Sequence, residues 1–210
     1  EKMIVILKEN TTKMDYIDLF GELNLNDYYR TDLHWRQEKL IDLANLIFKE
    51  FNNDTRISSN SFTKNQLHPF YGSYYGQAAL KVEPDTLVYL TNELIEKAIV
   101  YDYEAKAFLP VYQIDRFTGV DPYDLFLGGA KPLLTVFNPS ADFDKELILF
   151  RDSFGSSLAP LLLAGYSKIT LVDLRYMTTE VLSDYLDFQG EADVLFLYNT
   201  QILNRSQLLR

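Results

Sequence analysis

Two stretches far apart in the chain hold the residue types that serine-dependent acyl transfer requires. The first, Arg151 to Gly155 (Arg-Asp-Ser-Phe-Gly), follows an apolar run at 147–150 and precedes an apolar stretch at 158–164. This order predicts a strand, a tight turn and a helix, with Ser153 at the turn. Backbone N–H groups are unpaired at the start of a helix, and the helix dipole is positive there. A serine at this position suits a nucleophile whose oxyanion those N–H groups stabilise.

The second stretch, Tyr28 to Trp35, supplies a base and a carboxylate. The chain contains two histidines, and one of them, His34, follows Asp32 by two positions. A serine nucleophile needs a base within hydrogen-bond reach, and that base needs a carboxylate that orients it. If both side chains face one cleft, Asp32 holds one imidazole nitrogen of His34 and the other nitrogen faces Ser153. Distance along the sequence does not prevent this, because such triads are defined in space.

Simpler interpretations stay open at this stage. An Asp-x-His pair is common in proteins, and Asp152 or Ser153 is also a typical N-cap of the helix that follows. His68, beside a proline in a polar segment, fits a solvated loop histidine. The aromatic residues of segment 71–75 suit packing better than a platform for sugars.

Composition excludes several classes of function. The chain has 210 residues and a net charge of −10, and no dense cluster of lysine and arginine offers phosphates a basic face, so we expect no nucleic-acid partner. It has no cysteine, and its two histidines lie far apart, so no ligand spacing typical of zinc is present and we expect no metal. No apolar run is long enough for a membrane span. Because the chain begins at Glu1 without an initiator methionine, we expect an N-terminal signal or anchor to precede it.

The residue pattern predicts an α/β protein. Strands are expected at residues 3–7, 14–19, 85–90 and 133–137, and a β-hairpin is expected at 97–112. A helix is expected at 36–51, a loop at 52–69, and non-helical structure at 71–76. Residues 70–140 therefore resemble a β-rich insertion within the α/β core.

The C-terminal third alternates more regularly. Strands are expected at 147–150, 168–174 and 192–198, and helices at 154–164 and 179–188. Such alternation with short connections predicts a parallel sheet that is covered on both faces. Active groups gather beyond the C-terminal ends of such strands, where Ser153, Arg175 and Asn199 fall.

Taken together, the two stretches resemble the DHHW protein family. They also resemble, more distantly, the SGNH-hydrolase-like O-acetyltransferases that modify bacterial exopolysaccharides, such as the alginate type. The residues that carry the resemblance are Tyr-Tyr-Arg-Thr-Asp-Leu-His-Trp at 28–35, Phe-Leu-Gly-Gly at 126–129, Arg-Asp-Ser-Phe-Gly at 151–155, Leu-Val-Asp-Leu-Arg-Tyr at 171–176 and Val-Leu-Phe-Leu-Tyr-Asn at 194–199. Two positions depart from the pattern: Leu33 replaces the first histidine of Asp-His-His-Trp, and Arg151 replaces the glycine of Gly-Asp-Ser.

The resemblance implies a fold and a set of site residues. The fold is an SGNH-hydrolase-like three-layer sandwich with a central parallel sheet, formed by a single domain over residues 1–210 with the β-rich insertion at about 70–140. Ser153 is implied as the nucleophile, His34 as the general base and Asp32 as its orienting carboxylate. Apart from the resemblance, contacts to the oxyanion or the substrate are predicted for four further residues, of which the first two are chosen for their positions at strand ends: Arg175, Asn199, Arg151 and Tyr29.

The resemblance also implies an activity. It is acyl transfer outside the cytoplasmic membrane, as an O-acetyltransferase or acetylesterase acting on a cell-envelope or secreted polysaccharide through an acetyl-serine. No cofactor is expected, and a membrane-bound O-acyltransferase is the implied partner on the donor side. The alternative is a catalytically inactive carbohydrate-binding or assembly module of the same fold.

Overall fold

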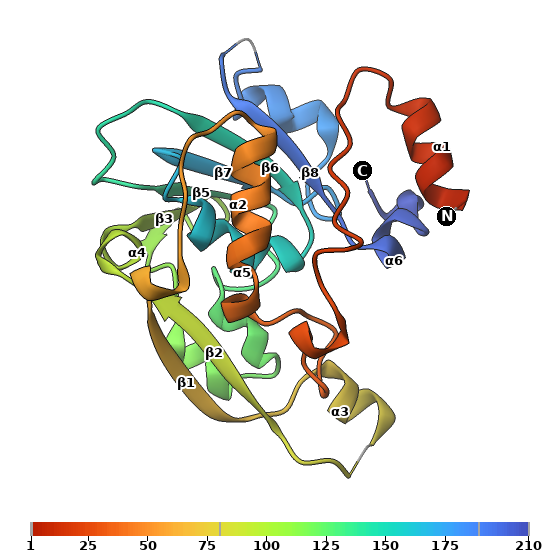
Figure 1. Cartoon of the computed structure of the whole chain (residues 1–210), viewed down its shortest axis with the longest axis vertical. Helices are drawn as coiled ribbons and strands as arrows, with labels where there is room; N and C mark the ends of the chain where they lie inside the picture. Colours follow the sequence, from red (N-terminus) through yellow and green to blue (C-terminus); the bar gives the residue numbers. More distant parts are fainter. Residues whose placement is uncertain (1, 80, 189, 210) are drawn as a thin grey trace.

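The structure, a computed structural model, describes residues 2–79, 81–188 and 190–209. Within these residues the strands form a six-stranded sheet in the order β4-β3-β5-β7-β6-β8 and a separate two-stranded sheet, β1-β2 (Figure 1). The strands are β1 (Thr63–Phe70), β2 (Asp85–Thr91), β3 (Ile99–Asp102), β4 (Ala107–Leu109), β5 (Leu133–Phe137), β6 (Glu146–Arg151), β7 (Lys168–Val172) and β8 (Asp193–Leu197).

The helices are short. The α-helices are α1 (Lys2–Asn10), α2 (Ile41–Glu50), α3 (Ser73–Ala78), α4 (Glu93–Lys97), α5 (Phe154–Leu162) and α6 (Thr200–Leu203). The 3-10 helices are η1 (Leu25–Asp27), η2 (Gln37–Lys39), η3 (Ser59–Ser61), η4 (Ile114–Thr118), η5 (Pro122–Leu125), η6 (Thr179–Asp184) and η7 (Ser206–Leu208).

The large sheet is mixed, so the prediction of a central parallel sheet is wrong. Among its described strands, β6 runs parallel to β7 and β8, whereas the pairs β3-β4, β3-β5 and β5-β7 are antiparallel. The parallel half is the part whose alternation of strand and helix was visible in the sequence. The antiparallel half comes from the segment before β6, where β3 and β4 form a hairpin and β5 pairs with β3. Antiparallel neighbours of this kind need no helical crossover between them.

Alternating residues of the strands pack on the two faces of this sheet. One face packs against α2 and α5, where Leu43, Ile47, Leu158 and Leu162 are fully or almost fully buried. The opposite face is covered by the chain that follows β7, through Leu174, Met177 and Leu182. A third apolar cluster lies around the β1-β2 ribbon and η5 and contains Tyr29, Phe70, Leu87, Tyr123, Leu125 and Phe126.

Several local predictions are confirmed and others are wrong. The helix at 36–51 is present as η2 and α2, and the strands at 85–90, 133–137, 147–150, 168–174 and 192–198 are present, as is the hairpin. The prediction of a strand at 3–7 is wrong, because these residues lie in α1, where Val5 and Ile6 are about half exposed. Residues 14–19 form no strand, and the predicted loop at 52–69 contains most of β1. Segment 71–76 enters α3, and the helix predicted at 179–188 is a 3-10 helix over Thr179–Asp184.

The organisation as a single domain with a β-rich insertion at about 70–140 stays a prediction. Within that segment, β2 pairs with β1 outside the large sheet, whereas β3, β4 and β5 extend the large sheet itself. In the described part of the chain, no helix is long and apolar enough to cross a lipid bilayer.

Candidate active site

Ser153 lies at the corner where β6 ends and α5 begins. The backbone of Ser153 is helical (φ −60°, ψ −22°). Among the residues that the structure describes, its side chain makes no hydrogen bond that caps α5. The capping acceptor is Asp152, whose Oδ1 accepts the N–H of Phe154 at 3.0 Å and whose Oδ2 accepts the N–H of Asn199 at 2.7 Å. Because Asp152 takes the capping role, the hydroxyl of Ser153 remains available for another partner.

That partner is His34. Its Nε2 lies 2.7 Å from Ser153 Oγ, and its Nδ1 lies 2.5 Å from Asp32 Oδ1. An ionised carboxylate only accepts hydrogen bonds, so a neutral imidazole donates from Nδ1 to Asp32 and accepts the hydroxyl proton of Ser153 at Nε2. The structure therefore brings the three predicted residues into one hydrogen-bonded chain, in the arrangement that deprotonation of a serine requires.

Asp32 is held as a carboxylate. It is 1% exposed, and burial alone would raise the pKa of its carboxyl group. The hydrogen bond and electrostatic attraction of His34, together with the N–H groups of Ser73 and His34, outweigh burial and lower this pKa below its ordinary value. The N–H of Ser73 donates to Oδ2 at 2.8 Å, and the N–H of His34 donates to Oδ1 at 2.9 Å.

A tight loop presents Asp32 and His34. Tyr28 and Trp35 form an isolated antiparallel bridge, and the N–H of Tyr29 donates to the carbonyl of His34 at 3.1 Å. Thr31, at the tip of the loop, donates its N–H and its hydroxyl to Asp85 Oδ2 at 2.8 and 2.9 Å. The loop is thereby fastened to the first residue of β2, and the orientation of Asp32 does not depend on its own side-chain contacts alone.

Aromatic rings enclose the imidazole. The ring of Tyr123 in η5 stacks on His34, and the ring of Phe154 lies with its centroid 4.9 Å from the imidazole. The hydroxyl of Tyr123 donates to Ser157 Oγ at 2.7 Å, and the indole N–H of Trp35 donates to the same oxygen at 2.9 Å. Ser157, one turn after Ser153, therefore ties η5 and the His34 loop to α5.

The four residues assigned to the oxyanion or the substrate are placed differently. Arg175 donates to Asp173 from Nε at 2.9 Å and from Nη2 at 2.6 Å, so its guanidinium is engaged in a bidentate ion pair. The side-chain oxygen of Asn199 caps α6, and this residue reaches the Ser153 corner only through its backbone N–H to Asp152. The functional role of both residues stays a prediction.

Arg151 and Tyr29 are buried. The guanidinium of Arg151 is fully buried, with Nη1 3.8 Å from Asp173 Oδ2 and Nη2 3.5 Å from the carbonyl of Gly129. Burial lowers the pKa of this guanidinium, and the nearby carboxylate of Asp173 counteracts the effect. Tyr29 packs edge-on against Phe70, and a role for either residue at the substrate stays a prediction.

Sequence reasoning missed Tyr123, Ser157 and Ser73. Tyr123 lies in Asp-Pro-Tyr-Asp-Leu, where the proline indicates a turn and nothing marks the tyrosine as a neighbour of His34. Ser73 contributes through its backbone N–H, which leaves no signal in the side-chain pattern. Ser157 was visible only as the second serine of Ser-Ser after Gly155.

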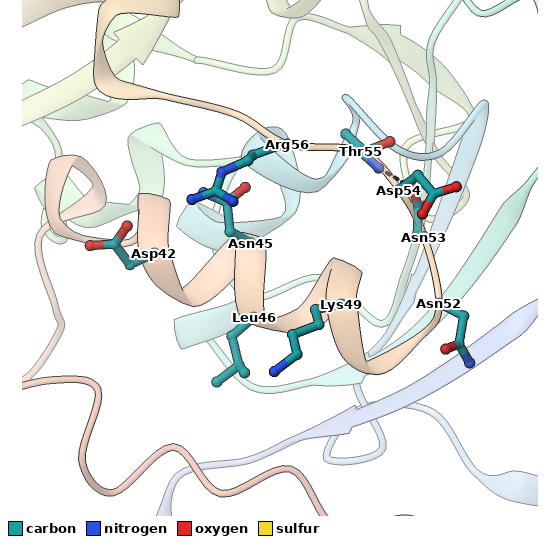
Figure 2. A pocket seen from close by; sticks show the side chains of 9 residues that line it. All are labelled: Asp42, Asn45, Leu46, Lys49, Asn52, Asn53, Asp54, Thr55 and Arg56. Carbon is teal, nitrogen blue, oxygen red and sulfur yellow. Dashed lines mark hydrogen bonds between the residues drawn. The ribbon is translucent and has the colours of Figure 1, made fainter.

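A separate shallow pocket of about 600 Å³ lies beside α2 and the chain that follows it. Figure 2 shows its lining side chains, which are Asp42, Asn45, Leu46, Lys49, Asn52, Asn53, Asp54, Thr55 and Arg56. None of them belongs to the Ser153 site. Elsewhere in the described residues, no group of three or more His, Cys, Asp or Glu side chains is arranged to hold a metal ion.

The fold and the site together define an α/β protein with a mixed sheet and a hydrogen-bonded Ser-His-Asp set at the start of a helix. The chain belongs to the DHHW protein family, whose model matches residues 3–172. A search of curated protein sequences found no match.

Solved structures support the fold. The chain is similar to a DHHW family protein from Eubacterium siraeum, with 22% identity and a TM-score of 0.66 over 82% of this chain, and it spans 58% of the length of that protein. It is also similar to Bacillus cereus PatB1 with a sulfonyl adduct, with 16% identity and a TM-score of 0.64 over 96% of this chain and 67% of that one. A second structure of PatB1 gives the same TM-score over 94% of this chain and 68% of that one. At these identities the likeness concerns the fold.

Proposed function

We propose that the protein is a serine-dependent acyltransferase of the SGNH-hydrolase-like three-layer type, acting as an O-acetyltransferase or acetylesterase. The observation that carries the proposal is the 2.7 Å contact of His34 Nε2 with Ser153 Oγ, with Asp32 behind the imidazole at 2.5 Å. This geometry suits removal of the hydroxyl proton as the serine attacks a carbonyl carbon.

The reaction proceeds in two halves. Ser153 Oγ attacks the acetyl carbonyl of the donor while His34 takes the hydroxyl proton, and the N–H of Ser153 at the start of α5 is the candidate donor to the oxyanion. The intermediate collapses to an acetyl-serine as His34 returns the proton to the leaving oxygen. A sugar hydroxyl or water, deprotonated by His34, then attacks the acetyl-serine and restores the free serine.

The comparisons support this proposal at the level of the fold. One PatB1 structure carries a sulfonyl adduct, and sulfonyl reagents react with activated nucleophiles. By resemblance, we place the protein outside the cytoplasmic membrane, with a cell-envelope or secreted polysaccharide as acceptor and a membrane-bound O-acyltransferase as partner on the donor side. We propose no cofactor, no metal and no nucleic acid in the reaction.

Labelling at Ser153 tests the proposal. A fluorophosphonate probe should add its mass to this residue, and p-nitrophenyl acetate should be hydrolysed. Ser153→Ala, His34→Ala and Asp32→Asn should each reduce turnover by about three or more orders of magnitude, because triad members act as a unit. Ser140→Ala is the matched control, since Ser140 is exposed and lies outside the site, and it should retain turnover.

An unlabelled Ser153 would contradict the proposal, as would turnover that survives all three substitutions. An unlabelled Ser153 together with no turnover would favour the alternative, a catalytically inactive carbohydrate-binding or assembly module of the same fold.

A further inference from the structure

Helix α3 is joined to the candidate active site by its first backbone groups. The N–H of Gly72 donates to Thr31 Oγ1 at 3.1 Å, and the N–H of Ser73 donates to Asp32 Oδ2 at 2.8 Å. The N–H groups of Tyr74 and Tyr75 donate to the carbonyl of Thr31 at 2.9 and 3.3 Å. Four successive N–H groups therefore fix the start of α3 to Thr31 and Asp32.

The backbone approach at this junction is close. A Cβ atom added to Gly72 would overlap the side chain of Asp32 and would lie 2.6 Å from the carbonyl oxygen of Thr31. Figure 1 shows α3 at the periphery of the molecule, beside the N-terminal segment that contains these residues. The helix is thus bonded at one end, and none of its residues is buried, although Ser73 and Tyr75 are only partly exposed.

The exposed part of this segment is aromatic. Tyr71 is 41% exposed and Tyr74 is 39% exposed, and the rings of Tyr71 and Tyr75 lie 4.5 Å apart at an angle of 48°. A Cβ atom added to Gly76 would meet no atom within 4 Å, so the space around this position of α3 is open. The rings of Tyr71 and Tyr75 thus lie together, and Tyr74 is exposed on the same short segment, whose first N–H groups bond Thr31 and Asp32.

The same segment carries no charge. Residues 71–79 are Tyr-Gly-Ser-Tyr-Tyr-Gly-Gln-Ala-Ala, in a chain of which 24% is charged. A partner attracted by charge would find nothing to pair with here. Aromatic faces flanked by hydroxyl and amide groups instead suit a ligand with an apolar ring face and many hydroxyl groups.

We propose that Tyr71, Tyr74 and Tyr75 form a stacking platform for a pyranose ring of the acceptor glycan. This inference rests on the proposed function for the nature of the ligand. A sugar seated on the platform lies beside the start of α3, which is bonded to Thr31 and Asp32 on the loop that also carries His34. The four N–H bonds keep the platform and the triad in a fixed relation, which suits selection of the hydroxyl that is acylated.

Binding measured without chemistry tests the platform. The Ser153→Ala protein is titrated by isothermal calorimetry with neutral tetrasaccharides of glucose, mannose, galactose or N-acetylglucosamine. We expect at least one to bind, and we expect Tyr71→Ala and Tyr74→Ala, each in the Ser153→Ala background, to weaken that binding about tenfold. Tyr71→Phe and Tyr74→Phe should retain most of the affinity, because the ring is preserved.

A matched control and two contrary outcomes complete the test. Tyr185 is 51% exposed on the chain after η6, so Tyr185→Ala removes an exposed tyrosine outside the platform and should bind as the parent does. Binding that survives both alanine substitutions at Tyr71 and Tyr74, or no binding of any tetrasaccharide, overturns the platform. Because Ser153 is absent from these proteins, failure of acylation in the wild-type protein is a separate result and concerns the proposed function alone.

Discussion

The imidazole of His34 lies flat on the ring of Tyr123, with ring centroids 3.8 Å apart and planes within 3° of parallel. Tyr123 is itself fixed, because its hydroxyl donates to Ser157 Oγ in α5. Helix α5, which begins directly after Ser153, thus also positions the ring of Tyr123 that stacks on His34. Rotation of His34 away from the serine would require the stack to open.

Removal of this stack should reduce turnover while the triad residues remain. We expect Tyr123→Leu to lower kcat for p-nitrophenyl acetate by about tenfold to a hundredfold, because small losses of orientation at a reacting group are costly. Tyr123→Phe keeps the ring and removes only the hydroxyl, so its kcat should stay within a few-fold of the wild type. Equal losses in the two variants would show that the hydroxyl, and not the stacked ring, matters.

The space at Gly72 gives a second prediction. Gly72→Ala places a methyl group against Asp32 and should cost about 1–3 kcal/mol of unfolding free energy, together with a loss of turnover, since overpacking displaces the neighbouring group. Gly76→Ala lies in the same helix with open space around it, and should stabilise the protein by up to about 1 kcal/mol. Urea unfolding of both variants measures the contrast, and two equal free energies would contradict it.

The buried charges behind β6 and β7 should matter chiefly for stability. Asp173 is fully buried and receives the bidentate bonds of Arg175, whereas Arg151 approaches it only to 3.8 Å. We therefore expect Arg175→Ala to destabilise the protein by about 2–4 kcal/mol, because it leaves a buried carboxylate poorly paired. Arg151→Met retains that ion pair and should change stability by only about 1 kcal/mol in either direction.

The Arg175→Ala variant also tests whether Arg175 contacts the acyl group in the proposed reaction. Measured well below the unfolding temperature, kcat of Arg175→Ala should stay within tenfold of the wild type if the residue acts only on Asp173. A loss of about a hundredfold or more in the folded variant would instead support the oxyanion role predicted from the strand-end position.

Asp124, next to Tyr123, provides a prediction on pH. Burial, and then the charge of Asp121, raise the pKa of its carboxyl from 3.8 to about 6, and the charges of Arg116, His34 and Lys131 act in the opposite direction. Because the folded pKa lies above the unfolded value, this group favours folding below about pH 4 and loses that contribution as pH rises through 6. A shift of this size corresponds to at most about 3 kcal/mol, and partial exposure reduces it to about 1 kcal/mol.

Asp124→Asn should therefore stabilise the protein by about 1 kcal/mol at pH 8 relative to the wild type, and by less at pH 4. Urea midpoints at the two pH values measure this difference. A variant whose advantage is the same at both pH values would contradict the assigned titration.

The site was more predictable from the sequence than the sheet. Ser153, His34 and Asp32 carry distinctive side chains in two stretches that together resemble a known family, so their proximity could be expected from that resemblance. The groups that orient them left weaker marks. Ser73 acts through a backbone N–H, and Tyr123 comes from a turn with no motif around it.

The errors in the fold have a common physical cause. An apolar run of five residues, such as 3–7, fits a strand or a helix equally well, and only a neighbouring strand would have settled it. Within the described residues β1 pairs only with β2, and most of its side chains are exposed. Its sequence, 63–70, is therefore polar and lacks the alternation of apolar residues that is typical of a strand packed on a core. Strand direction is also absent from periodicity, which is why the antiparallel pairing of β5 with β3 and β7 was not predicted.

The separation of His34 and Ser153 by 119 residues has a consequence for how the protein folds. The base and the nucleophile meet only after the chain between them has closed a long loop, and such non-local contacts form late and slowly. If the proposed esterase activity is found, it should therefore be a stricter reporter of the native state than circular dichroism during refolding. It should return after the helical signal and together with the stacking of His34 on Tyr123.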